Sequence, residues 1–147
     1  MTTSVVTLPI GPDRYAVPAS RVREVVADPR PTRLPTAPAM LLGAFNLRGE
    51  VVPMFDTAAL LGIGQVSEIT VAVVVTTPAG PAGLVVTGLP KVATIGEAVA
   101  PSELRGTLGV YPIDGGFVVL LDIDALLLGH ASSSAATAAL VDPLVTT

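Results

Sequence analysis

The sequence predicts a mainly β protein, with two small β-barrels of about five strands each packed side by side across an apolar seam. First, half of the 147 residues are apolar, yet only three Phe, two Tyr and no Trp are present. The core must therefore be built from Val, Leu, Ile and Ala, and the β-branched residues among them favour strands. Second, fourteen Gly and fourteen Pro are spread along the chain, which is typical of many short elements joined by turns. Third, part of the sequence is repeated.

The repeat relates residues 43–61 to residues 109–127, 66 positions later, without a gap. It retains glycines at the turns, apolar residues in the strands and an aspartate after each second strand. The identical pairs are Gly43 and Gly109, Gly49 and Gly115, Val52 and Val118, Asp56 and Asp122, Ala59 and Ala125, Leu60 and Leu126, and Leu61 and Leu127. Such a repeat predicts two similar lobes. Units of about sixty residues with short strands suit small barrels, since closing a sheet removes its exposed edges.

The first half of the chain is predicted to begin with a hairpin, formed by strands at 4–10 and 15–18 around a turn at 11–13. Ser20 is placed to cap a single helical turn that leads into a strand. Four prolines exclude regular structure between residues 29 and 38. The elements expected next are a helical turn at 39–42, strands at 44–47 and 50–55, and a helix at 57–61 between Asp56 as N-cap and Gly62 as terminator.

The second half is predicted to hold further strands at 68–76, 82–86 and 91–95, a loop at 96–106 with one helical turn at 101–104, and the repeated unit. We expect one barrel over about 14–66 and the other over about 67–128, the latter joined by the N-terminal strand 4–10. The whole domain then covers residues 4–128. The tail, 129–147, is rich in Ala, Ser and Thr and is expected to be either a helix at 135–141 or disordered.

Composition excludes several kinds of protein. The chain has no Cys and one His, so disulfides, thiolate metal sites and multi-histidine sites are excluded. Its net charge of −4 argues against general nucleic-acid binding. No apolar run approaches the roughly 18–20 residues of a membrane span, and the first residues lack signal-peptide features, so we expect a soluble cytoplasmic protein. Residues 14–33 hold five Arg against two acids, which indicates either a solvated edge or a surface for an acidic protein partner.

Two groups of aspartates are candidates for catalysis or metal binding. Asp56-Thr57-Ala58 matches the signature of aspartic proteases, which need two carboxylates sharing a proton at about 3 Å. The repeat places Asp122 at the second site without the Thr-Gly or Thr-Ala that should follow, so capping of two equivalent helices explains both copies better. Asp114, Asp122 and Asp124 lack the pattern of a calcium loop. We therefore predict no catalytic residue, no metal site and no cofactor.

Glu24 and Arg48 are the polar residues that the lobe architecture does not require. Asp114 stands where the second copy should have Arg48, so the pair lies outside the repeat. If the two side chains meet, Arg48 can hold Glu24 through a two-pronged contact. The alternatives are an ion pair that only fixes the Pro-rich loop, or no contact. We favour a structural pair at the rim of a binding surface, as a specificity device.

The residues with this pattern resemble a known family. Val22-Arg23-Glu24-Val25, the loop containing Leu34-Pro35, and Gly43-Ala-Phe-Asn-Leu-Arg-Gly-Glu-Val-Val-Pro-Met-Phe-Asp56 are similar to the CheW-like domain. The resemblance runs from about residue 4 to 128, and its Asn-Leu-Arg-Gly block is the most specific part. It implies two five-stranded SH3-like barrels, which agrees with the repeat. The matching motif positions are Val22, Glu24, Gly43, Asn46, Arg48 and Gly49.

The resemblance also implies a function. CheW-like proteins are adaptors without enzymatic activity that couple methyl-accepting chemoreceptors to a CheA-type histidine kinase in membrane-associated arrays. The cytoplasmic hairpin tip of the receptor docks between the barrels, and the regulatory domain of the kinase pairs barrel to barrel. By this resemblance Val22, Glu24, Asn46 and Arg48 bind partners, while Gly43, Gly49 and Asp56 maintain the architecture. No direct membrane insertion is expected.

Two other functions remain open at this point. One is a small-ligand sensor that uses the groove between the barrels, and the other is an aspartic-type hydrolase at Asp56. The second copy of the repeat keeps the glycines and the aspartate but replaces Asn46, Arg48 and Glu50. The functional hypothesis therefore narrows to the turn 46–49 and to Glu24.

Overall fold

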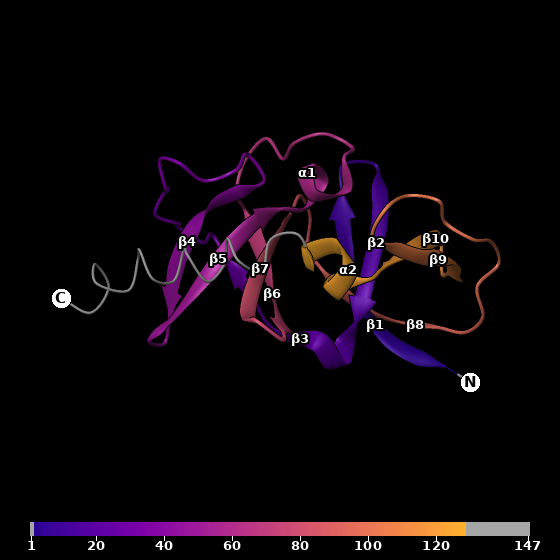
Figure 1. Cartoon of the computed structure of the whole chain (residues 1–147). Helices are drawn as coiled ribbons and strands as arrows, with labels where there is room; N and C mark the ends of the chain where they lie inside the picture. Colours follow the sequence, from indigo (N-terminus) through magenta and orange to yellow (C-terminus); the bar gives the residue numbers. More distant parts are fainter. Residues whose placement is uncertain (1, 129–147) are drawn as a thin grey trace.

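The computed structural model describes residues 2–128 and contains two five-stranded sheets (Figure 1). Its elements are β1 (Thr3–Ile10), β2 (Asp13–Pro18), η1 (Ala19–Arg21), β3 (Val22–Ala27), β4 (Leu41–Leu47), β5 (Glu50–Asp56), α1 (Thr57–Leu61), β6 (Val71–Thr77), β7 (Gly80–Val86), β8 (Lys91–Ile95), β9 (Thr107–Ile113), β10 (Gly116–Leu121) and α2 (Ile123–Leu127). The first barrel has the strand order β3-β6-β7-β5-β4, and the second has the order β8-β1-β2-β10-β9. The predicted fold class of two small five-stranded barrels is confirmed.

The internal repeat is visible in the structure. β4 and α1 recur as β9 and α2 with the 66-residue offset found in the sequence. The two sheets also correspond strand by strand, and each contains one parallel pair, β5 with β7 and β10 with β2. The sequence repeat covers only the hairpin and helix, whereas the structural repeat extends to all five strands.

The predicted boundary between the barrels is wrong for three strands, β2, β6 and β7. β6 and β7 pair with β3 and β5 and complete the first barrel, and the N-terminal hairpin β1–β2 completes the second. The other strands lie in the predicted barrels, and the strand at 4–10 joins the second barrel as expected. Along the chain, β1 and β2 belong to the second barrel, β3–β7 form the first barrel, and β8–β10 complete the second. The sequence repeat could not show this, because it does not include the hairpins that are exchanged.

The cores explain why the two barrels stay together. Alternate residues of the central strands face different clusters: Leu8 lies in a cluster shared by both barrels, whereas Val5 lies in a cluster inside the second. In the same way Val73 faces the shared cluster and Ala72 faces the inside of the first barrel. Strands buried on both faces read as continuous apolar runs rather than as alternating ones. The predicted apolar seam is thus a core of its own.

Three local predictions are corrected. The segment expected to form a helical turn at 39–42 is a single turn, closed by the Leu41 amide donating to the Pro38 carbonyl, after which β4 begins. The helical turn η1 exists, but no side chain caps it, so Ser20 has no capping role. Residues 101–104 contain no helix. The tail at 129–147 lies outside the described residues.

The two aspartates that follow the repeated hairpins cap the two helices, as predicted. Asp56 accepts a hydrogen bond from the Ala59 amide at 3.1 Å, and Asp122 accepts one from the Ala125 amide at 3.1 Å. Asp56 is almost fully buried and its second oxygen also accepts from the Val66 amide at 3.0 Å. Asp56 therefore fixes both the helix and the loop that follows it.

Asp56 accepts hydrogen bonds from two amides and Asp122 from one, so removing each carboxylate should cost a different amount of stability. Asp56→Ala leaves two amides without an acceptor and should lower the free energy of unfolding by about 2–3 kcal/mol. Asp122→Ala removes only the helix cap and should cost about 1 kcal/mol. Urea unfolding followed by circular dichroism measures both losses, and equal losses would contradict the double role of Asp56.

Candidate functional site

Gly43 lets the Pro-rich loop lie against the outer edge of β4. The amide and carbonyl of Thr32 exchange hydrogen bonds of 2.7 and 3.0 Å with Ala44. A Cβ atom at Gly43 would stand 2.3 Å from the Thr32 carbonyl oxygen, and the residue has a φ of +145°. Glycine is therefore required by close backbone approach as well as by conformation. This contact explains the structural part of the motif.

The motif turn is a two-residue hairpin connection between β4 and β5. Arg48 has a φ of 53° and Gly49 has a φ of 87°, which is the left-handed pair that two-residue hairpins favour. The side-chain oxygen of Asn46 accepts a hydrogen bond from the Gly49 amide at 2.8 Å. Asn46 thus stabilises the turn, which holds Arg48 in a conformation that is uncommon for a residue with a side chain.

A β-bulge in β3 places Arg23 and Glu24, which carry opposite charges, beside this turn. Val22 pairs with Val75 and Glu24 pairs with the adjacent Val74, so Arg23 is an extra residue in the strand. An extra residue bends the strand and redirects its side chains. As a result, neighbouring residues of β3 can both reach toward the β4–β5 hairpin.

The four charged residues form two ion pairs across the first barrel, here called the latch. Arg48 Nη1 donates to Glu24 Oε1, and Arg23 Nη2 lies 2.6 Å from Glu50 Oε1. The latch joins β3 to the β4–β5 hairpin, and β3 and β4 are the two edge strands of the sheet. The predicted meeting of Glu24 with Arg48 is confirmed, although the contact is a single hydrogen bond.

The latch is more exposed than a structural ion pair normally is. The Arg48 side chain is 71% exposed and the Glu24 side chain is 23% exposed. Pairs of this kind stabilise a fold by roughly 0–1 kcal/mol. The contribution of the latch to stability is therefore small. Because its side chains are exposed, their charges are accessible at the rim of the barrel. Val22, at the start of β3, is half-buried and packs against the shared core.

Sequence reasoning missed the second pair of the latch. Glu50 differed from its repeat counterpart, Gly116, and this difference was the only available signal. The hydrogen bond donated by Arg23, supported by charge attraction, lowers the pKa of the Glu50 carboxyl below its usual value, although desolvation opposes the shift. Glu50 is consequently ionised over a wider pH range than a free glutamate.

A further unpredicted contact joins the two barrels. Arg21 donates to the Thr76 carbonyl at the end of β6 and also to both carboxylate oxygens of Asp124 in α2. The hydrogen bond from Arg21 lowers the pKa of the Asp124 carboxyl. Asp124 therefore has an architectural partner. Residues 2–128 contain no group of three or more His, Cys, Asp or Glu side chains that could hold a metal.

Comparison with known proteins decides the family. The family model of the CheW-like domain matches residues 4–129, which span both barrels. This chain belongs to the CheW-like domain family. The family predicted from the Asn-Leu-Arg-Gly block is therefore confirmed, and the latch residues lie within the matched domain.

Relatives and a solved structure agree with this membership. The chain is 29% identical over 136 residues to the probable chemotaxis protein CheW of Rhizobium etli, covering 86% of this chain and 88% of the relative. It is 30% identical over 128 residues to the chemotaxis protein CheW of Rhizobium meliloti, covering 80% and 82%. The crystal structure of the scaffolding protein TtCheW from Thermoanaerobacter tengcongensis matches with a TM-score of 0.76 at 24% identity, over 86% of this chain and 88% of the other. That likeness shows the fold.

The helices of this CheW-like domain are short. Within residues 2–128, none is long and apolar enough to cross a membrane.

Gly43 provides a test of the close approach at the Pro-rich loop. Gly43→Ala should lower the free energy of unfolding by about 2–4 kcal/mol, because the new methyl group meets the Thr32 carbonyl. Gly64→Ala is the matched control, since Gly64 has a similar φ of +142° with no atom within 4 Å and should lose about 1 kcal/mol from strain alone. Similar losses in urea unfolding would show that conformation alone requires Gly43.

The ion pair between Arg23 and Glu50 is expected to depend on pH. Since the folded pKa of Glu50 is lowered, its contact with Arg23 contributes above the unfolded pKa and is lost as the pH falls through the folded value. Arg23→Gln should raise the pKa of Glu50 toward its usual range, and Arg30→Gln should leave it unchanged. Carbon-13 NMR titration of the Glu50 carboxyl measures this, and a pKa unaffected by Arg23→Gln would contradict the pairing.

Proposed function

We propose that this protein is an adaptor that couples chemoreceptors to a CheA-type histidine kinase. The observation that carries the proposal is the match to the CheW-like domain over residues 4–129, which spans both barrels. An adaptor of this kind acts by binding two partners together and raising their effective concentration for each other. On this proposal the protein works at the cytoplasmic face of membrane receptor arrays, through its partners rather than through a membrane segment.

The rim of the first barrel is the proposed contact for the cytoplasmic hairpin tip of the receptor. Val22 supplies an apolar contact, and Glu24 and Arg48 supply charges that fix orientation. Asn46 contributes indirectly, because its side chain is engaged with the Gly49 amide. The exposure of the Arg48 guanidinium supports this arrangement, since it leaves donors for a partner.

The regulatory domain of the kinase is the second proposed partner, bound barrel to barrel. Exposed edge strands of small β-barrels are suited to such contacts. The likeness of this chain to the scaffolding protein TtCheW in fold supports a surface of the same architecture. No residue of the kinase contact is assigned.

The proposal includes no catalysis. Asp56 is buried and accepts hydrogen bonds from two amides, and Asp122 caps α2. Both carboxylates are thus engaged in the fold, which speaks against the protease alternative. A ligand sensor that uses the groove between the barrels is not favoured either. The hollow where the barrels meet, between the β6–β7 turn and α2, measures about 140 Å³, below the roughly 300–1,000 Å³ of small-molecule sites.

The adaptor proposal is tested by binding. The full chain should retain both a receptor cytoplasmic hairpin and a CheA regulatory domain in pull-downs at tens of micromolar or below, an affinity of about 6 kcal/mol or better. Failure to bind either partner at that concentration would refute the proposal.

Arg48→Ala separates function from folding. The variant should bind the receptor hairpin about tenfold more weakly, while its free energy of unfolding changes by less than about 1 kcal/mol. Arg30→Ala is the control, because Arg30 is 86% exposed and pairs only with its neighbour Asp28 among the described residues. Calorimetric titration measures the loss of binding, and thermal melting measures the change in stability. If Arg48→Ala unfolds the protein, Arg48 is primarily a structural residue and this prediction is wrong.

A further inference from the structure

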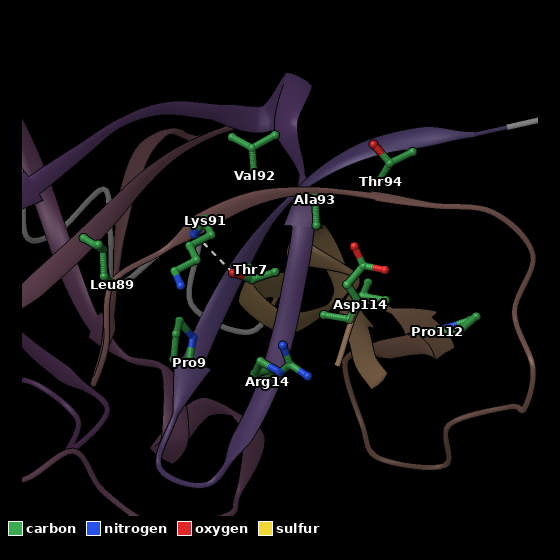
Figure 2. A pocket seen from close by; sticks show the side chains of 11 residues that line it. Thr7, Pro9, Arg14, Leu89, Lys91, Val92, Ala93, Thr94, Pro112 and Asp114 are labelled. Atoms are coloured by element: carbon green, nitrogen blue, oxygen red, sulfur yellow. Dashed lines mark hydrogen bonds between the residues drawn. The ribbon is translucent and has the colours of Figure 1, made fainter. Parts of the chain in front are cut away.

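The second barrel has an open groove of about 1010 Å³ between its edge strands β8 and β9, here called the mouth groove. Residues 91–94 of β8 line one side of it, and residues 112–114 at the end of β9 line the other (Figure 2). Arg14 of β2 lies between these two sides in the same view. The mouth of a β-barrel is a place where small molecules commonly bind, in pockets of roughly 300–1,000 Å³.

The mouth groove opens onto the inside of the barrel. Residues two apart on a strand share a face. Three strands each have a residue in or against the inner core cluster of the second barrel: Val5, Ala16 and Ala93. Thr7, Arg14 and Lys91 line the groove, and each stands two positions from one of these residues. They therefore share the inner face, above an apolar floor that includes Ala93 and Ile113.

The rim of the mouth groove carries the charges of the Glu24–Arg48 pair with reversed signs. Lys91 takes the place of Glu24, because both lead through paired residues to the same position of the sequence repeat. The two paths run from Glu24 through Val74 and Gly83 to Met54, and from Lys91 through Thr7 and Ala16 to Leu120. The ends of these paths lie 66 positions apart. By the same offset, Asp114 takes the place of Arg48.

The two reversed charges do not pair as their counterparts do. Lys91 and Asp114 form no ion pair within residues 2–128. In the first barrel the long side chain of Arg48 reaches Glu24 from the turn, whereas an aspartate at the same place is much shorter. The mouth groove therefore stays open, with an ammonium group on one side and a carboxylate on the other (Figure 2).

Arg14 brings a second cation to the groove and is held in place there. Its Nη2 donates a hydrogen bond to the Gly115 carbonyl at 3.1 Å. A Cβ atom at Gly116 would stand 2.7 Å from the same nitrogen, so the glycine makes room for the guanidinium. The Arg14 side chain donates no other hydrogen bond among residues 2–128. Since a guanidinium has several N–H donors, most of them are left for a ligand.

The charges along the mouth groove define the class of ligand that fits it. A ligand with only a carboxylate would be repelled by Asp114, and a ligand with only an amine would be repelled by Arg14 and Lys91. A zwitterion offers an opposite charge to each of these three groups. An apolar body on the same ligand matches the apolar floor of the groove.

We propose that the mouth groove binds a small zwitterion with an apolar body, namely a free α-amino acid with an apolar side chain. Arg14 and Lys91 bind its carboxylate, for which a guanidinium has the matching geometry, and Asp114 binds its ammonium group. The apolar side chain packs on Ala93 and Ile113. This site is separate from the latch and from the hollow where the barrels meet, so it goes beyond the adaptor function proposed above.

The probe is L-leucine, and two analogues each lack one of its charges. Isocaproate lacks the ammonium group, and isoamylamine lacks the carboxylate. Added to the full chain, leucine should shift the amide NMR signals of β8 and of the β9–β10 turn. Each analogue should bind at least about threefold more weakly, which is the size expected for losing one exposed charge contact.

Variants of the groove test the assigned roles. Asp114→Asn should weaken leucine binding at least about threefold and should abolish the preference for leucine over isocaproate. Lys91→Gln should reduce the preference for leucine over isoamylamine, with part of it retained through Arg14. Arg105→Gln is the matched control, because Arg105 is exposed and lies outside the groove, and it should leave both preferences unchanged.

Three outcomes would overturn the proposal. One is the absence of shifts in β8 and the β9–β10 turn with leucine at tens of millimolar. Another is binding of isocaproate as tightly as leucine, because the groove would then be a site for simple anions. The third is a preference for leucine that Asp114→Asn leaves intact. The two analogues are compared on the natural chain, so they decide the question even if a variant does not fold.

Discussion

The burial of the central strands on both faces is the constraint on which the rest of this structure depends. β1, β2, β6 and β7 contribute alternate residues to the shared core and to the core of their own barrel. Neither barrel can expose the shared face without a large loss of apolar burial. The two barrels are therefore held as one unit, and the Arg21 contact to Thr76 and Asp124 crosses the same junction. The strands at the edges of the two sheets, β3, β4, β8 and β9, are left for contacts with other molecules.

The two barrels share an architecture but differ at their rims. The glycines, the apolar strands and the capping aspartates recur, because both folds need them. The latch of Arg23, Glu24, Arg48 and Glu50 occurs only in the first barrel, and an open groove stands at the equivalent place in the second. A duplicated fold can thus carry different contacts at equivalent edges, because side chains at the rim are under little packing constraint. This asymmetry gives an adaptor two distinct surfaces.

Several features could be predicted from the sequence because they depend on local residues. The cap at Asp56, the terminator Gly62, which has a φ of 73°, and the turn at Arg48 all follow from short-range chemistry. The pair of Glu24 with Arg48 could be predicted because Arg48 differs from its repeat counterpart, Asp114, and Glu24 is a charged residue beside the apolar Val25 and Val26. The barrel boundary was not predictable, since β6 and β7 are apolar on both faces and carry no sign of their partners. The bulge at Arg23 depends on strand register, which a single sequence does not contain.

We propose that the receptor contact lies at the latch rim of the first barrel and that the equivalent rim of the second barrel, which carries Lys91 and Asp114, does not bind the receptor. Hydrogen-exchange mass spectrometry of the full chain with a receptor cytoplasmic hairpin tests this claim directly. We expect added protection in the segments containing Val22–Glu24 and Asn46–Gly49, with none in the segments containing Lys91 and Asp114. Equal protection at both sets of segments, or protection only in the second barrel, would contradict it.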